Sequence, residues 1–192
     1  MRDTTKRKIA NCVKKLMTKK DIRKITIQDV MDETKMSRQC FYYHFRDIYD
    51  VVEWIIEHDF TEKISCEKSQ SIEDWAVCVS HVQKEERAFF ERIVNQMEWP
   101  KLVAMIREPI EEQMRNILRS NRLVSLDHNA FEFCIKFAAD SYCYRLLDDA
   151  YRRKYKTDEE VRMEINGLFL MVSSQSVVCQ MDTSKFRQKI AV

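Results

Sequence analysis

Glycine is almost absent from this chain, because Gly167 is the single glycine among 192 residues. Glycine averages about 7% of soluble proteins and supplies the left-handed backbone of many tight turns. An all-β sandwich or barrel needs many such turns, so the sequence argues against one. Phosphate-binding and dinucleotide-binding loops are excluded too, because they need several glycines close together. We therefore expect an all-α fold with helices joined by short polar loops.

Neither a membrane span nor a secretion signal is visible in the sequence. No apolar run approaches the roughly 18 residues that a span needs, and the first residues, MRDTTKRKIANC, lack the apolar core of a signal peptide. Seven cysteines are scattered along the chain without a Cys-x-x-Cys pair. This pattern favours reduced thiols over a disulfide framework. The sequence predicts a cytoplasmic protein with no membrane partner.

The small net charge of +2 conceals an uneven distribution. Residues 1–46 carry 13 Lys and Arg against 5 Asp and Glu, a net charge of +8, whereas residues 47–192 carry a net charge of −6. A compact basic segment on a mildly acidic remainder indicates binding of a polyanion through the N-terminal part. Charge alone leaves a second interpretation open, in which the lysines form only a solvated helix face.

Helical periodicity divides the chain into a head, residues 1–46, a connecting helix, residues 47–64, and a body, residues 65–192. Thr26, Ser37, Asp47 and Ser71 stand where helices are expected to begin, because their side chains can cap free backbone N–H groups. Pro109 is expected to kink its helix. The predicted helices are 4–19, 27–34, 38–44, 48 to about 63, 72–84, 87–98, 101–119, 127–153 and 158–180.

Two short helices, 27–34 and 38–44, follow a basic amphipathic helix and are joined by Lys35-Met36. This arrangement is typical of a helix-turn-helix, whose second helix enters the major groove of DNA. Arginine can bind guanine through two hydrogen bonds and glutamine can pair with adenine, so the start of the second helix is suited to read bases. The expected base-reading residues are Ser37, Arg38, Gln39 and Cys40. The residues one turn later, expected to bind phosphates, are Tyr42, Tyr43 and His44.

The head resembles the DNA-binding domain of TetR-family transcriptional regulators. That family has a Thr opening the second helix, a Ser opening the third, and Tyr-x-His-Phe closing the third. The matching residues here are Thr26, Ser37, Tyr42, His44 and Phe45. The stretch from Arg38 to Asp50 is similar to a subgroup that includes activators of dihydroxyacetone kinase genes. The resemblance covers roughly residues 5–56, and beyond them only the helical layout matches.

The resemblance assigns roles within the motif. It implies that Thr26, Tyr42 and His44 contact phosphates and that Phe45 locks the third helix into the core. It implies base contacts for Arg38, Gln39, Cys40 and Tyr43. Two residues depart from the family pattern in the head: Lys35 replaces a common glycine in the turn, and Ile48 replaces a common phosphate-binding lysine. The helix 127–153 also lacks the glycines common in the core helices of the family.

The last two predicted helices resemble the pair that forms a dimeric four-helix bundle in the family. The first of them is apolar on more than one face, which indicates burial on two sides. A homodimer follows, with an ordinary monomer core as the alternative. The expected dimer residues are Phe131, Tyr142, Phe169, Val172, Ser173 and Ser176.

A ligand pocket is expected among the aromatic and polar residues of the body. The candidates are Trp75, Cys78, His81, Phe89, Phe90, Trp99, Met105, Phe137 and Tyr142, and a plain packing role is the alternative for each. Cys78 and His81 lie three residues apart but lack a third metal ligand, so no metal site is predicted. Cys40 lies near a helix start beside Arg38, which suits either a redox-sensitive thiol or a simple packing residue.

The sequence predicts a regulator, not an enzyme, and no cofactor. No nucleophile–histidine–carboxylate pattern, paired-carboxylate motif or cofactor loop is visible. The expected function is a TetR-type regulator that binds double-stranded DNA as a homodimer on a palindromic operator. A small ligand or a partner protein at the body would control it. The alternative is a co-regulator with the same fold that acts through a partner protein and binds DNA weakly or not at all.

Overall fold

The computed structural model describes residues 2–65, 71–120 and 128–173, and within these ranges helices are joined by short turns and loops, with no strand among them. An all-α fold is therefore confirmed. No helix in the described part of the chain combines the length and apolar character that crossing a bilayer requires. The elements are α1 (Arg2–Met17), a 3₁₀ turn η1 (Ile22–Lys24), α2 (Ile27–Thr34), α3 (Arg38–His44), α4 (Ile48–Ile56), a π-helical turn η2 (Glu57–Thr61), α5 (Glu62–Ile64), α6 (Ile72–Glu85), α7 (Arg87–Gln96), α8 (Trp99–Ser120), α9 (His128–Arg152) and α10 (Asp158–Ser173).

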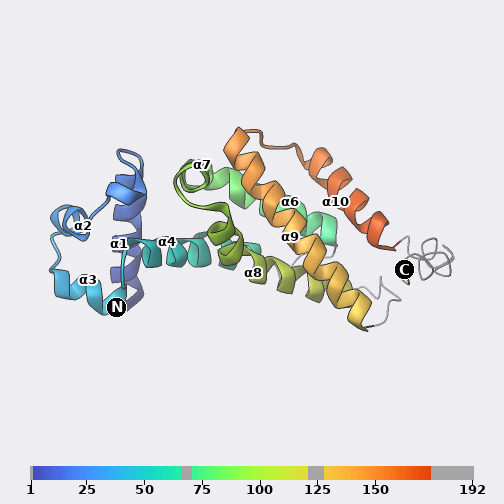
Figure 1. Ribbon diagram of the computed structural model, residues 1–192, viewed down its shortest axis with the longest axis horizontal. Coiled ribbons are helices and arrows are strands. Elements are labelled where there is room, and N and C mark those ends of the chain that lie inside the picture. Colours follow the sequence, from blue (N-terminus) through green and yellow to red (C-terminus); the bar gives the residue numbers. More distant parts are fainter. Residues whose placement is uncertain (1, 66–70, 121–127, 174–192) are drawn as a thin grey trace, which may run out of the picture.

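The molecule is elongated, with the head at one end and the helices of the body at the other (Figure 1). Helices α1, α2 and α3 form the head, and α4 leads from it into the body. In the body, α9 packs mainly on α8, and α10 packs mainly on α6. The head therefore stands apart from most of the body, which leaves α3 open to a partner molecule.

The core of the head consists of apolar side chains that recur at helical spacing. Ile9 and Val13 on α1 are fully buried, as are Val30 on α2 and Phe41 on α3. Phe45, directly after α3, is also buried and its ring lies 6.0 Å from that of Phe41. The resemblance implied this core position for Phe45, and the packing fixes which face of α3 points outward.

The connecting helix is continuous from Ile48 to Ile64, but its middle turn is π-helical. Its buried side chains, including Val51, Val52 and Ile55, are the apolar residues that predicted this helix. Nothing in the sequence pattern predicted the π-helical turn. This turn places Asp59 in a buried position, facing α1.

Ion pairs at Asp59 join the head to the rest of the molecule. Lys14 on α1 binds both Asp59, at 2.9 Å, and Glu86 between α6 and α7, at 2.5 Å. Arg7 also pairs with Asp59. The Arg7 guanidinium lies over the Trp54 ring, 4.6 Å from its centre. These contacts hold α1 against the connecting helix and the body.

The proline positions in the body differ in their effects. Pro100 is the second residue of α8. Backbone N–H groups in the first turn of a helix make no intrahelical hydrogen bond, so a proline there costs none. Helix α7 ends at Gln96, so the predicted break at Pro100 falls within a few residues of the observed one. Pro109 lies inside α8, which continues through it as one α-helix.

Candidate nucleic-acid interface

The start of α2 is fixed by a reciprocal cap. The Thr26 hydroxyl accepts a hydrogen bond from the Asp29 backbone N–H at 3.2 Å, and the Thr26 N–H donates to the Asp29 carboxylate at 2.7 Å. Hydrogen bonds from the Lys20 side chain and from Thr26 lower the pKa of Asp29 to about 2. The carboxylate is therefore ionised at neutral pH and stabilises the positive end of the helix.

The turn between α2 and α3 adopts the left-handed conformation at Lys35, with φ of 59° and ψ of 31°. Its N–H donates to the Met31 carbonyl at 2.8 Å and closes α2. Ser37 then caps α3, because its hydroxyl accepts a hydrogen bond from the Cys40 N–H at 3.2 Å. These two residues make the sharp change of direction that a helix-turn-helix needs.

Helix α3 has one buried face and one open face. The Phe41 side chain on the inner face of α3 is buried, whereas the side chains of Tyr42 and Tyr43 are 60% and 66% exposed. Arg38 and Gln39 are exposed at its N-terminal end. Of the eight residues predicted to contact DNA, Cys40 and His44 are half-buried. The other six are exposed: Thr26, Ser37, Arg38, Gln39, Tyr42 and Tyr43.

Gln28 on α2 orients the side chain of Arg38, a relationship that the sequence analysis missed. The Gln28 side-chain oxygen accepts hydrogen bonds from Arg38 Nη2 at 2.9 Å and Nε at 3.2 Å. Gln28 Nε2 in turn donates to Asp32 at 2.7 Å. The available signal was the spacing of Gln28 and Asp32, four residues apart on one helix face. Arg38 retains three of its five N–H donors, which suffice for a two-bond contact to guanine.

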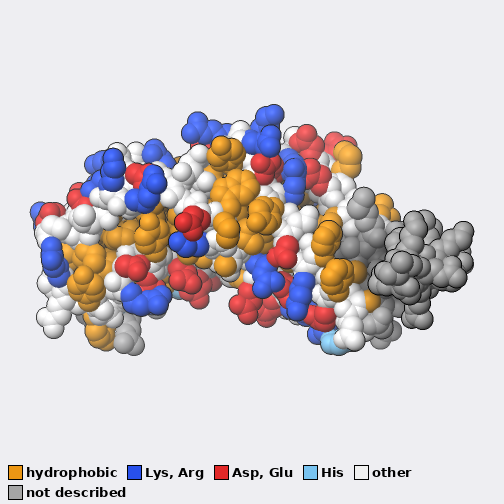
Figure 2. Space-filling model, viewed as in Figure 1, with side chains coloured by type: hydrophobic (Ala, Val, Ile, Leu, Met, Phe, Trp, Pro, Cys, Tyr) orange, Lys and Arg blue, Asp and Glu red, His pale blue; other side chains and the backbone are white. Residues whose placement is uncertain are grey.

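The N-terminus of α4 departs from the family pattern in a specific way. Ile48 is buried, so the position where the family commonly has a phosphate-binding lysine contributes to the core. Arg46, two residues earlier, is exposed, and its guanidinium lies 3.4 Å from the Asp50 carboxylate. Arg46 is therefore a solvent-accessible cation only two residues before this position. Figure 2 shows Lys and Arg side chains distributed over the head, at the left of the view.

The predicted pocket residues do not converge on one place. Trp75 and Phe89 are buried in the core, as is Phe90, while Phe137 is 62% exposed. Cys78, Trp99 and Met105 are half-buried. His81 is exposed and binds Asp158 at 2.8 Å. Tyr142 alone among the candidates lines the cavity between α6, α9 and α10. No three metal-binding side chains come together among the described residues.

The structure describes the side chains of two of the six predicted dimer residues, Phe131 and Tyr142. Phe131 is buried, and Tyr142 is half-buried with its hydroxyl donating to the Ala76 carbonyl at 3.3 Å. Phe169, Val172 and Ser173 belong to α10, and their side chains lie outside the described part of the structure. Ser176 also lies outside it. The exposed apolar residues of α9 are instead Phe133, Phe137, Tyr144 and Tyr151.

The described cysteines are free thiols: Cys12, Cys40, Cys78, Cys134 and Cys143. Burial raises the pKa of Cys143 to about 12 and also raises the pKa of Cys12 and of Cys134. These three thiols are therefore protonated at neutral pH and poorly reactive.

Comparison with solved structures places this arrangement in a known fold. A dihydroxyacetone kinase operon activator, DhaS, matches with a TM-score of 0.66 over 88% of this chain and 96% of its own, at 20% identity. A TetR transcriptional regulator from Streptococcus agalactiae 2603V matches with a TM-score of 0.64 over 90% of this chain and 95% of its own, also at 20% identity. The chain has the TetR-type helical fold.

Sequence comparison adds one curated relative, the HTH-type dhaKLM operon transcriptional activator DhaS of Lactococcus lactis subsp. lactis (strain IL1403). The two are 36% identical over 61 residues, which are 32% of this chain and 33% of that protein. The chain thus matches about a third of the length of this relative. None of the protein-family models matches the chain. The predicted resemblance to TetR-type regulators, including the dihydroxyacetone kinase subgroup, is confirmed, and these similar proteins are regulators rather than enzymes.

Proposed function

We propose that this protein is a transcriptional regulator that binds double-stranded DNA through α3. The observation that carries the proposal is the two-sided character of this helix. Phe41 and Phe45 anchor it, while Arg38, Gln39 and Tyr43 are presented to solvent. A helix held in this way can enter the major groove with its first turn against base edges. The regulators with which it shares its fold support the same function.

The direct test is DNA binding as a function of salt concentration. The logarithm of the association constant for the DNA upstream of its own gene should fall linearly with the logarithm of salt, because phosphate contacts release counterions. Arg38→Ala should weaken binding to this DNA more than binding to random DNA. Equal loss on both would remove Arg38 as a base reader. Absence of salt-sensitive binding by the purified protein would contradict the proposal.

The proposal includes a homodimer on a palindromic operator, formed through α9 and α10. Phe133 and Phe137, 71% and 62% exposed, lie on one line along α9 with Tyr144 and Tyr151, since these residues are spaced by four and seven. Figure 2 shows hydrophobic side chains following α9 across this face of the body. A row of exposed aromatic side chains of this length is typical of an interaction surface.

Gly167 supports the same interface. It lies within α10, where glycine costs about 1 kcal/mol of helix stability relative to alanine. Apart from its chain neighbours and the nearby backbone of α10, no described heavy atom lies within 4 Å of the position that a Cβ would take. Nothing in the described part of the chain therefore requires glycine there, whereas close approach of a second copy would. Met163 and Leu170, both exposed, flank it on the same helix.

Sedimentation analysis tests the dimer. Phe137→Glu should convert the dimer to a monomer, because it places a charge in the centre of the proposed interface. Tyr49→Glu, a change of an exposed aromatic residue at the start of α4, is the matched control and should leave the dimer intact. A monomeric wild-type protein, or a dimer unaffected by Phe137→Glu, would contradict this interface.

The proposed regulator acts in the cytoplasm and responds to a small ligand or a partner protein bound to the body. Such a ligand would favour one spacing of the two α3 helices over another. The alternative function is a co-regulator that acts mainly through a partner protein. Burial of Ile48 favours this alternative, because it removes a phosphate contact from α4. Salt-independent assembly with a partner protein, without DNA binding, would identify the co-regulator.

A further inference from the structure

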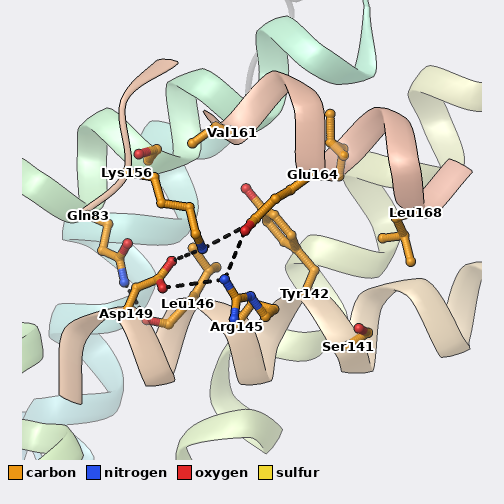
Figure 3. Close-up of a pocket in the computed structure, with 12 residues that line it drawn as sticks. Gln83, Ser141, Tyr142, Arg145, Leu146, Asp149, Lys156, Val161, Glu164 and Leu168 are labelled. Atoms are coloured by element: carbon orange, nitrogen blue, oxygen red, sulfur yellow. Dashed lines mark hydrogen bonds and ion pairs between the residues drawn. The ribbon is translucent and has the colours of Figure 1, made fainter. Parts of the chain in front are cut away.

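A cavity of about 230 Å³ lies between α6, α9 and α10 (Figure 3). Its apolar wall consists of Leu146 on α9 and Val161, Ile165 and Leu168 on α10. This volume is below the usual range for drug-sized ligands, so the cavity suits a small molecule. The mixture of an apolar wall and charged residues suits an amphipathic one.

Four charged side chains form a closed ring at this cavity, as the dashed lines of Figure 3 show. Lys156 lies 2.5 Å from Asp149 and 3.0 Å from Glu164. Arg145 lies 3.0 Å from Glu164 and 3.8 Å from Asp149. Arg145 and Asp149 belong to α9, Lys156 follows α9, and Glu164 belongs to α10. The ring therefore ties α10 to α9 through one carboxylate, that of Glu164.

The two carboxylates of the ring are not equivalent. The Asp149 side chain is 14% exposed, whereas that of Glu164 is 48% exposed. A half-exposed ion pair contributes little net stability, because water competes for both charges. Replacing the Glu164 carboxylate by another carboxylate would preserve both of its ion pairs and return Glu164 to water. Glu164 thus occupies the position that a ligand anion would take.

The two largest uncharged polar side chains at the cavity, Tyr142 and Gln83, are already engaged in hydrogen bonds. The Tyr142 hydroxyl donates to the Ala76 carbonyl at 3.3 Å, and Gln83 Nε2 donates to the Leu146 carbonyl at 2.6 Å. Burial raises the pKa of Tyr142, so it remains an uncharged phenol. The strongest anchors that the cavity offers a ligand are consequently the two cations, Arg145 and Lys156.

We propose that this cavity binds a short-chain amphipathic carboxylate in competition with Glu164. The ligand carboxylate lies between Arg145 and Lys156, and its apolar chain lies against Leu146, Val161 and Ile165. Binding displaces Glu164 and releases the ionic link between α10 and α9. The binding site stands independently of DNA recognition, whereas any effect on DNA affinity rests on the proposed function.

Calorimetric titration of the full chain with hexanoate tests the site, with hexanol and hexylamine as probes of equal chain length. Hexanoate should bind with a stoichiometry of one per chain, and the other two at least tenfold more weakly. Equal binding of hexanol would overturn the proposal, because it would reduce the site to an apolar cavity. Absence of saturable hexanoate binding up to tens of millimolar would also overturn it.

Variants separate competition from simple packing. Glu164→Gln should tighten hexanoate binding at least threefold, since it removes the competing anion, whereas Glu159→Gln, exposed on the same helix, should leave affinity unchanged. Lys156→Met should weaken binding at least tenfold; if circular dichroism shows that it is unfolded, Arg145→Gln takes its place with the same expected loss. Unchanged or weaker binding by Glu164→Gln overturns the proposal. DNA binding is measured without hexanoate, so failure of either proposal is recognised separately.

Discussion

Gln28 holds Arg38 by two hydrogen bonds across the turn of the motif, with Arg38 Nη2 at 2.9 Å and Nε at 3.2 Å from the Gln28 side-chain oxygen. The residue proposed to read a base is thus positioned by the preceding helix before any DNA is bound. Asp32 completes the chain by accepting a hydrogen bond from Gln28. This pre-organisation lowers the entropic cost of placing a long side chain in the groove.

Gln28→Leu should therefore reduce sequence discrimination without reducing general affinity for DNA. We expect specific binding to weaken about tenfold, within the 1–3 kcal/mol range of a good two-bond base contact, while binding to random DNA stays the same. Fluorescence anisotropy with both DNAs measures the ratio. Asn11→Leu, an exposed change on α1, is the control. A parallel loss on both DNAs would show that Gln28 contributes a phosphate contact instead.

Thr26→Ala removes the cap of α2. The change leaves the Asp29 N–H without its acceptor and should lower the free energy of unfolding by about 1 kcal/mol. Urea denaturation measures the effect. Thr26→Ser retains the hydroxyl and should restore most of the stability; if it is as unstable as the alanine variant, the hydroxyl is not what stabilises the helix.

Lys35→Gly should stabilise the head. A side chain in the left-handed conformation costs about 1 kcal/mol, which glycine avoids, and the greater flexibility of unfolded glycine offsets part of this gain. A net increase of roughly 0.5 kcal/mol in unfolding free energy is expected. Lys24→Gly, where φ is not positive, should instead be destabilising. Equal destabilisation by both changes would refute the argument.

Asp59→Asn breaks the contacts between α1 and the connecting helix. It leaves Arg7 and Lys14 without their shared carboxylate and should cost about 1–3 kcal/mol, discounted because both cations are partly exposed. Glu57→Gln, an exposed change in the same turn, should have little effect. Thermal unfolding at neutral pH distinguishes the two.

The same variant predicts a pH dependence. Burial raises the pKa of Asp59, but hydrogen bonds from Lys14 and Arg7 outweigh this effect and lower it overall. A carboxyl whose pKa is lowered by folding stabilises the protein above its unfolded pKa of about 4 and loses that contribution as pH falls through the folded value. The stability difference between wild type and Asp59→Asn should thus be constant from pH 6 to 8 and shrink below pH 4. A constant difference at all pH values would assign it to packing.

Gly167→Phe should weaken the proposed dimer while leaving the isolated chain folded. The Cβ of the new side chain has open space around it, and the ring would meet a closely packed second copy. Sedimentation equilibrium should show at least tenfold weaker association, with unchanged helicity by circular dichroism. Gly167→Ala serves as the small control. Undiminished association of the phenylalanine variant would place the interface elsewhere.

Local chemistry made the head predictable from sequence. The caps at Thr26, Ser37 and Asp47 begin helices at the expected residues, because each needs only a side-chain oxygen and a nearby N–H. The family resemblance placed Lys35 where related proteins commonly have glycine, and Lys35 adopts the left-handed conformation that glycine favours.

The cavity was not predictable, because its charged ring closes only when α10 packs beside α9. Arg145 and Asp149 are four residues apart on one helix, but Lys156 and Glu164 join them only after α10 folds back. Large aromatic residues such as Trp75 were natural pocket candidates, yet tertiary packing buries Trp75 completely. A single sequence shows which residues are apolar but not which of them will fill the core.

The π-helical turn from Glu57 to Thr61 sets the angular phase between the two ends of the connecting helix. Such a turn accommodates one residue more than a regular turn. In an unbroken α-helix of the same sequence, the residues after it would be rotated by about 100° relative to those before it. The length of this one turn therefore sets the direction in which the head faces. Deletion of a single residue within the turn would convert it to a regular α-helical turn. Deletion elsewhere in the connecting helix would rotate α3 about the axis of that helix.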